Sequence, residues 1–130
     1  MMYFDSNLAT VNYIPEKRTV EVIWKGEFVK SEDYRMTLQK ALELLVKHKA
    51  ECWLSDMTMQ KAVSQEDKKW VDEHVIPLAI KNGVKKAAFV VPQNIFAKLY
   101  ADQLAKSIKN SGFEFQYFEN RKSAYTWFSN

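Results

Sequence analysis

Residues 85–92 read Lys-Lys-Ala-Ala-Phe-Val-Val-Pro, and this stretch decides the class of fold. From Ala87 to Val91 both alternate sets of side chains are apolar, which is typical of a strand buried on both faces. Strands of that kind lie inside parallel sheets, and Pro92 lacks the backbone donor that a longer strand would need. The stretch therefore predicts a central parallel strand in an α/β protein.

Upstream of this strand, two alternating runs predict a β-hairpin. Leu8–Ile14 and Thr19–Lys25 each place apolar side chains on one face and polar ones on the other. The polar segment Pro15–Arg18 is a turn, with proline where a type I turn favours it. A short third strand is expected at Glu51–Ser55.

Four helices are expected between and after the strands. Ser31 begins the first, and Ser64 caps the second, which Pro77 is expected to kink or to end early. A third helix is expected over Asn94–Asn110, and Asn120 caps a short last helix. The apolar stripe expected to face inward on the second helix consists of Trp70, Val71, His74, Val75 and Leu78.

A last strand at Phe113–Phe118 completes the order ββαβαβαβα in one domain spanning residues 1–130. Right-handed crossovers between strands in chain order put all four helices on one face of a five-stranded, mixed, mainly parallel sheet. The alternative is a doubly wound sheet, but alternation in three strands favours one open face. The side chains expected under the helices are Trp24, Leu42, Leu45, Val75, Val90, Phe115 and Trp127. The residues expected on the open face are Thr10, Asn12, Glu21, Glu114 and Gln116.

The composition excludes several classes of protein. A hydrophobic fraction of 47% and an aromatic fraction of 14% exclude a disordered chain. A single cysteine, Cys52, permits no internal disulfide, as expected in a reducing cytoplasm, and the first residues lack a signal-peptide pattern. No apolar run approaches the roughly 20 residues of a membrane helix, so no membrane insertion is expected.

The net charge of +3 is small and comes mostly from lysine. Lys81, Lys85 and Lys86 cluster, and we interpret them as solvated surface rather than as a track for phosphates. No nucleic-acid partner is expected.

A set of short stretches spans nearly the whole chain. They are Val22–Gly26, Tyr34-Arg35, Trp53–Asp56, Trp70 with Pro77, Ala88–Pro92, and Ala124 with Trp127-Phe128. In this order and spacing they resemble the SpoIIAA-like family, the STAS domains of the anti-sigma-factor antagonist type with their lipid-carrier-like CRAL-TRIO relatives. The resemblance implies a βα superhelix with strands in chain order, and a non-enzymatic regulatory or interaction role.

One motif departs from the pattern of the sporulation-type STAS domains. These carry an Asp-Ser-x-Gly stretch at the start of the second helix, and its serine is phosphorylated. The corresponding segment here is Ser64-Gln65-Glu66-Asp67, which has no glycine and reverses the order of Asp and Ser. Ser64 is thus a disfavoured phosphosite, and we expect it to be a helix N-cap.

Ligands of parallel sheets gather beyond the carboxyl ends of the strands. The candidate ligand- or partner-binding residues at this rim are Phe28, Ser55, Asp56, Met57, Thr58, Met59, Gln93 and Asn94. Asp56 either binds a ligand or acts as a base, or it accepts backbone N–H bonds and fixes its turn. Met57 and Met59 either form an adaptable apolar surface with Phe28 or fold inward over the core.

No motif for catalysis, metal binding or a cofactor is present in the sequence. Cys52 lies inside a strand rather than on an elbow, and a buried inert thiol is expected there. His48 and His74 lie on different helices without metal-ligand spacing, and His74 is expected to pack on Trp70. No glycine-rich loop follows a strand. We therefore expect no catalytic residue, no metal ligand and no cofactor.

Two classes of function are compatible with these features. The first is an interaction module that binds a protein partner, and the second is a carrier of a small apolar ligand held between helices and sheet. A carrier needs an apolar pocket of roughly 300 Å³ or more, whereas an interaction module can be packed solid. Apolar area on the open face, at Ile23 and at Phe89 or its neighbours in the strand, also predicts a weak homodimer or a contact with a partner.

Overall fold

The computed structural model of the chain describes residues 2–6, 8–25, 30–59, 64–93, 95 and 114–129. Its strands are β1 (Met2–Asp5), β2 (Ala9–Ile14), β3 (Thr19–Trp24), β4 (Cys52–Asp56), β5 (Lys86–Val90) and β6 (Glu114–Phe118). Its helical segments are η1 (Pro15–Lys17), α1 (Ser31–His48), α2 (Gln65–Trp70), η2 (Val71–Val75), α3 (Ile76–Lys81) and α5 (Arg121–Phe128). The predicted helix of residues 94–110 lies outside the described residues, apart from Ile95.

All described strands form one sheet in the order β1-β2-β3-β4-β5-β6. β1, β2 and β3 are antiparallel neighbours, and β3 to β6 run parallel. The chain order of the strands and the mixed, mainly parallel sheet are as predicted, but the sheet has a sixth strand. β1 is only four residues long, too short to show a reliable alternation of apolar and polar side chains.

The alternation in β2 and β3 assigns the two faces of the sheet. Val11, Val22 and Trp24 point to the face that α1 covers, and they are buried there with the Leu45 side chain of the helix. The ring of Tyr34 stacks on Trp24 with the centroids 5.1 Å apart. The core on this face therefore combines two sets of apolar side chains. The strands contribute every second residue, and the helix contributes a stripe that repeats every 3.6 residues.

Residues 65–81 form one helical run, so of the two outcomes expected of Pro77, a kink or an early end, the early end does not occur. A π-helical turn, Val71–Val75, lies just before the proline. A proline ring has no N–H to offer and collides with the carbonyl group four residues earlier in a regular helix. The wider turn relieves that conflict, and the helix continues to its end at Lys81.

The π-helical turn also changes which side chains face the sheet. Val75 and Ala79 are buried, four residues apart, whereas Leu78 is 45% exposed. His74 is exposed as well, with its ring 6.2 Å from the ring of Trp70. The expected contact of His74 with Trp70 is present, but the prediction that His74 and Leu78 point inward is wrong because it assumed a regular period of 3.6.

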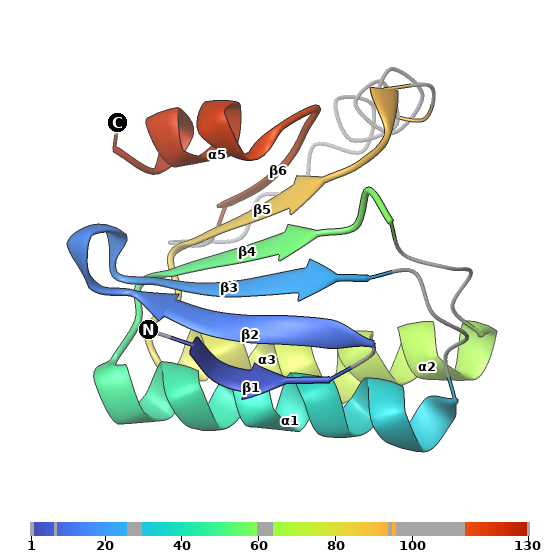
Figure 1. The fold of residues 1–130 in the computed structure, drawn as a ribbon. Helices are drawn as coiled ribbons and strands as arrows, with labels where there is room; N and C mark the ends of the chain where they lie inside the picture. Colours follow the sequence, from blue (N-terminus) through green and yellow to red (C-terminus); the bar gives the residue numbers. More distant parts are fainter. Residues whose placement is uncertain are drawn as a thin grey trace.

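The prediction that every helix covers one face is also wrong. α5 lies on the face of the sheet opposite to α1, α2 and α3 (Figure 1). Val90 and Trp127, which were assigned to the first core, belong to this second cluster with Leu54, Phe118 and Ala124. The handedness rule constrains only a helix that connects two parallel strands. Since α5 follows the last strand, either face was open to it.

Two residues expected to be exposed on the open face are not exposed there. Phe89 packs against the core on the α1 face. Its neighbours Ala88 and Val90 share the face of half-buried Ile23, but they are buried in the cluster beneath α5 and offer no exposed dimer surface. Glu21 is buried beneath α5, where it accepts hydrogen bonds from the Tyr125 hydroxyl and, at 3.3 Å, from Asn12 Nδ2. Burial and the neighbouring Glu21 carboxylate raise the pKa of Tyr125.

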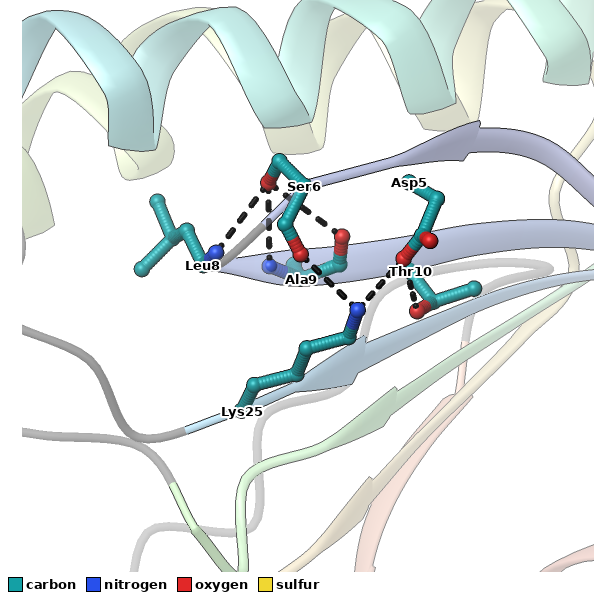
Figure 2. Close-up of polar contacts among 6 residues, drawn as sticks. All are labelled: Asp5, Ser6, Leu8, Ala9, Thr10 and Lys25. Carbon is teal, nitrogen blue, oxygen red and sulfur yellow. Dashed lines mark hydrogen bonds and ion pairs between the residues drawn. The ribbon is translucent and has the colours of Figure 1, made fainter.

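Polar contacts hold the short strand β1 in place (Figure 2). Ser6 Oγ accepts from the backbone N–H groups of Leu8 and Ala9 at 3.1 and 3.3 Å, which closes the turn between β1 and β2. Lys25, just after β3, reaches past β2 to the Asp5 carboxylate and to the carbonyl oxygen of Ser6. The hydrogen bond from Lys25 lowers the pKa of Asp5. These contacts add to the backbone pairing that holds the short edge strand on β2.

Lys49 ends α1 in the left-handed conformation, with φ of 52°. A side chain in this conformation costs roughly 1 kcal/mol relative to glycine, which is the usual residue at such helix ends. We therefore expect Lys49→Gly to raise the free energy of unfolding by about 0.5–1 kcal/mol in urea denaturation. The matched control Lys47→Gly lies inside the helix and should lower it by about 1 kcal/mol. A destabilised Lys49→Gly variant would contradict the expectation.

Candidate functional site at the carboxyl edge of the sheet

The parallel strands end at one edge of the sheet, where the loops after β4 and β5 meet. The backbone N–H of Met57 donates to the carbonyl oxygen of Val90 at 2.7 Å, which joins the first residue after β4 to the last residue of β5. Gln93, which follows β5 and Pro92, is exposed. Two further candidates from the sequence, Phe28 and Asn94, lie outside the described residues.

The Asp56 carboxylate at this edge is fully engaged. Its Oδ1 accepts from the backbone N–H of Thr58 at 3.1 Å and from the Thr58 hydroxyl at 2.7 Å. Its Oδ2 forms an ion pair with Arg121 Nε at 3.2 Å. Of its two interpretations, the geometry matches the one in which Asp56 fixes its turn, and it adds a contact to α5 that sequence patterns do not reveal.

Ser55 is also used internally. It is buried, and its Oγ accepts a hydrogen bond from Trp53 Nε1 at 2.9 Å. Trp53 belongs to the core on the α1 face, so the Ser55 hydroxyl lies on the same face of β4. It satisfies the indole donor rather than pointing beyond the edge.

The two methionines of the rim have different environments. Met57 is partly buried and packs against the core, whereas Met59 is 64% exposed. Ile95, which follows the neighbouring strand, is 42% exposed, and sequence reasoning did not single it out. The exposed Thr58 lies beside Met59 in the chain. The accessible apolar side chains of this edge are thus Met59 and Ile95 among the described residues.

An ion pair between half-buried Arg35 and buried Asp67 joins the starts of α1 and α2, and sequence reasoning missed it. The Asp67 side chain is 3% exposed and pairs with Arg35 Nε at 2.9 Å. Its other oxygen accepts from the Ser31 hydroxyl at 2.9 Å. The Arg35 guanidinium also lies 5.1 Å from the ring centroid of Trp70. The partners are more than thirty residues apart along the chain, so no local pattern could have paired them.

The electrostatics of this cluster favour the charged form of Asp67. Burial raises the pKa of the carboxyl group, but the hydrogen bonds from Arg35 and Ser31 outweigh it and leave the pKa below its ordinary value. The same negative charge and, above all, burial raise the pKa of Tyr34 to about 12. The cluster is therefore a fixed ion pair that sets the position of α2 against α1.

The thiol and imidazole groups are kept apart. Cys52 lies on the opposite face of β4 from Trp53, and burial raises the pKa of its thiol. His48 stacks on Tyr13 of the α1 face, with ring centroids 4.3 Å apart. The sheet thus separates the thiol from His48. Within the described ranges, no three His, Cys, Asp or Glu side chains gather as a metal site would require.

Asp67→Asn tests the ion pair through its pH dependence. The pKa of Asp67 is lower in the folded than in the unfolded chain, so the stabilisation is complete above about pH 5 and is lost as the pH falls through the folded pKa. We expect the variant to lose about 2 kcal/mol at pH 7, with a smaller difference from wild type at pH 3, by urea denaturation. The control Asp72→Asn, at an exposed position, should stay within about 0.5 kcal/mol. A difference that does not change with pH would contradict this.

Ser64 acts as the N-cap of α2, since its Oγ accepts from the backbone N–H of Asp67 at 3.1 Å. Ser64→Ala should therefore lower the free energy of unfolding by about 1 kcal/mol, and Ser64→Asp, which also caps, should be nearly neutral. Thermal denaturation checks both. If Ser64→Asp keeps the melting temperature but abolishes binding of a partner, the segment is a phosphorylation switch.

Comparison with known proteins identifies the family. A family model described as SpoIIAA-like matches residues 19–129, from the start of β3 to the residue after α5. The comparisons with curated proteins and with solved structures found no match. In the described part of the chain, no helix combines the length and the apolar character needed to cross a membrane.

Proposed function

The chain belongs to the SpoIIAA-like family, and on this premise we propose that it is a non-enzymatic regulatory module that binds a protein partner through the carboxyl edge of its sheet. The binding surface is the exposed pair Met59 and Ile95 with the polar Thr58 and Gln93 beside it. Methionine and aliphatic side chains at the centre of a patch with polar neighbours are typical of protein interfaces.

One observation carries this proposal. The edge exposes Met59 to 64% while its polar groups that could perform chemistry are occupied internally. Asp56 is held by Thr58 and Arg121, and Ser55 by Trp53. A general base or nucleophile must be within reach of a substrate proton or carbon. The side chains that remain accessible at this edge are better suited to binding a protein than to catalysis.

The alternative function, a carrier of a small apolar ligand, has weaker support. The two best-formed surface hollows among the described residues both open to solvent. One, of about 650 Å³, lies between the hairpin and α5, and its lining combines the apolar groups of Ile14 and Tyr125 with charged side chains such as Lys17 and Lys122. The other is lined by several lysines. A carrier buries most of its ligand's surface in an enclosed cavity, and both hollows are open to solvent.

Charge introduced at position 59 tests the proposal. We expect Met59→Lys to remove the proteins captured by the tagged wild-type chain from its native cell extract, because a lysine at the centre of an apolar contact leaves a desolvated charge. The affinity of the purified partner should fall at least about tenfold. Leu78→Lys is the matched control: Leu78 is 45% exposed but lies on α3.

The outcomes separate clearly. Loss of the partner with Met59→Lys and its retention with Leu78→Lys support the carboxyl edge. Retention by both variants, with melting temperatures unchanged, places any partner elsewhere and contradicts the proposal. A small molecule retained by the wild-type chain in native mass spectrometry would instead support the carrier function.

A further inference from the structure

A second surface lies at the amino edge of the parallel strands, opposite to the edge described above. Here η1, α1 and α3 end, and β3, β4 and β5 begin. The edge contains a hollow of about 570 Å³. The residues that line it are Arg18, Val46, Lys49, Glu51, Lys81, Asn82, Gly83 and Lys85.

This hollow contains the whole charge surplus of the protein. Four of the nineteen basic residues and one of the sixteen acidic residues line it, so the hollow is formally +3. The fifteen basic and fifteen acidic residues elsewhere cancel. A net charge that is concentrated on one concave surface produces a stronger local potential than the same charge spread over the chain.

The single carboxylate does not neutralise the hollow. Glu51 is shared between Arg18 Nε at 3.2 Å and Lys85 Nζ at 3.6 Å. Lys49 and Lys81 are exposed, and their ammonium groups form no ion pair with any described residue. The carboxyl ends of α1 and α3 also meet here and contribute about half a negative charge each. A charge of about +2 therefore remains.

Several residues of this hollow have a left-handed backbone conformation. Three described residues have positive φ: Arg18 at 48°, Lys49 at 52° and Gly83 at 104°. All three line the hollow. Each follows the end of a helical segment and precedes a strand. The three tight turns therefore lie at the same edge of the sheet as the cationic residues of the hollow.

We propose that this hollow binds an acidic segment of a partner protein, with carboxylate side chains on Lys49 and Lys81 and an apolar side chain on Val46. Val46 is 52% exposed beside the lysines, which suits a peptide that alternates acidic and apolar residues. A nucleic acid fits less well. No aromatic side chain lines the hollow for base stacking, and four cations are fewer than the roughly six to ten phosphate contacts of a typical complex.

The probe for this surface is a fluorescent peptide, Glu-Glu-Leu-Glu-Glu, titrated with the full chain in an anisotropy measurement. The test variant is the double change Lys49→Gln with Lys81→Gln. The matched control is Lys68→Gln with Lys122→Gln, which removes the same charge from exposed positions on α2 and α5. We expect about tenfold weaker binding for the test variant and less than about twofold change for the control. Salt should weaken the wild-type complex.

A single variant separates binding from folding. Lys49→Gly relieves the left-handed conformation, so its melting temperature should rise while its affinity for the acidic peptide falls. A merely structural effect would move both in the same direction. Met59→Lys, at the opposite edge, should leave peptide binding unchanged, so failure here and failure of the proposed function can be told apart.

Three results would overturn the proposal. The first is equal loss of binding in the test and control variants. The second is equal affinity for the neutral peptide Gln-Gln-Leu-Gln-Gln. The third is tighter binding of a single-stranded oligonucleotide than of the acidic peptide through the same two lysines, which would make the hollow a nucleic-acid surface.

Discussion

The right-handed sense of the crossovers fixes which face of the sheet is covered by a helix that connects two parallel strands. Strands β3, β4 and β5 lie side by side in chain order, so both crossovers between them must pass over the same face of the sheet. That places α1 and the α2–α3 run together beneath the sheet (Figure 1). It also gathers all their amino ends at one edge and all their carboxyl ends at the other. Ser31 and Asp67 meet at the first edge, and Lys49 and Lys81 at the second.

The opposite face is covered by a different kind of contact. α5 is free of the crossover rule, and its apolar cluster is small. Polar contacts supplement it: Tyr125 donates to Glu21, Arg121 pairs with Asp56, and Lys86 Nζ donates to the Trp127 carbonyl oxygen at 3.1 Å. These contacts reach β3, β4 and β5 in turn. Each contact engages a polar side chain of the sheet. Because Glu21 and Asp56 already bind Tyr125 and Arg121, they are not available for a ligand.

Local patterns in the sequence predict those elements whose side chains follow a regular period. Alternation locates β2 and β3, and continuous apolar character locates β5. Four residues are too few to show alternation, so β1 is missed. The π-helical turn before Pro77 breaks the 3.6 period, so the exposure of Leu78 is missed. The Arg35–Asp67 pair and the face of α5 depend on tertiary contacts, which no short window contains. The sequence predicts which residues lie at the carboxyl edge of the sheet. It does not predict which of their side chains remain accessible, because that depends on tertiary contacts.

The two edges should respond differently to salt. The carboxyl edge exposes a thioether and an aliphatic side chain, whose burial is not weakened by ionic strength. The amino edge exposes uncompensated lysines, whose attraction for an anion is screened with a Debye length of about 8 Å at physiological salt. β4 is five residues long, so the edges lie roughly 16 Å apart. That is about two Debye lengths, so the lysines act little on an apolar contact at the other edge. The salt dependence of binding therefore reports which edge a given partner uses.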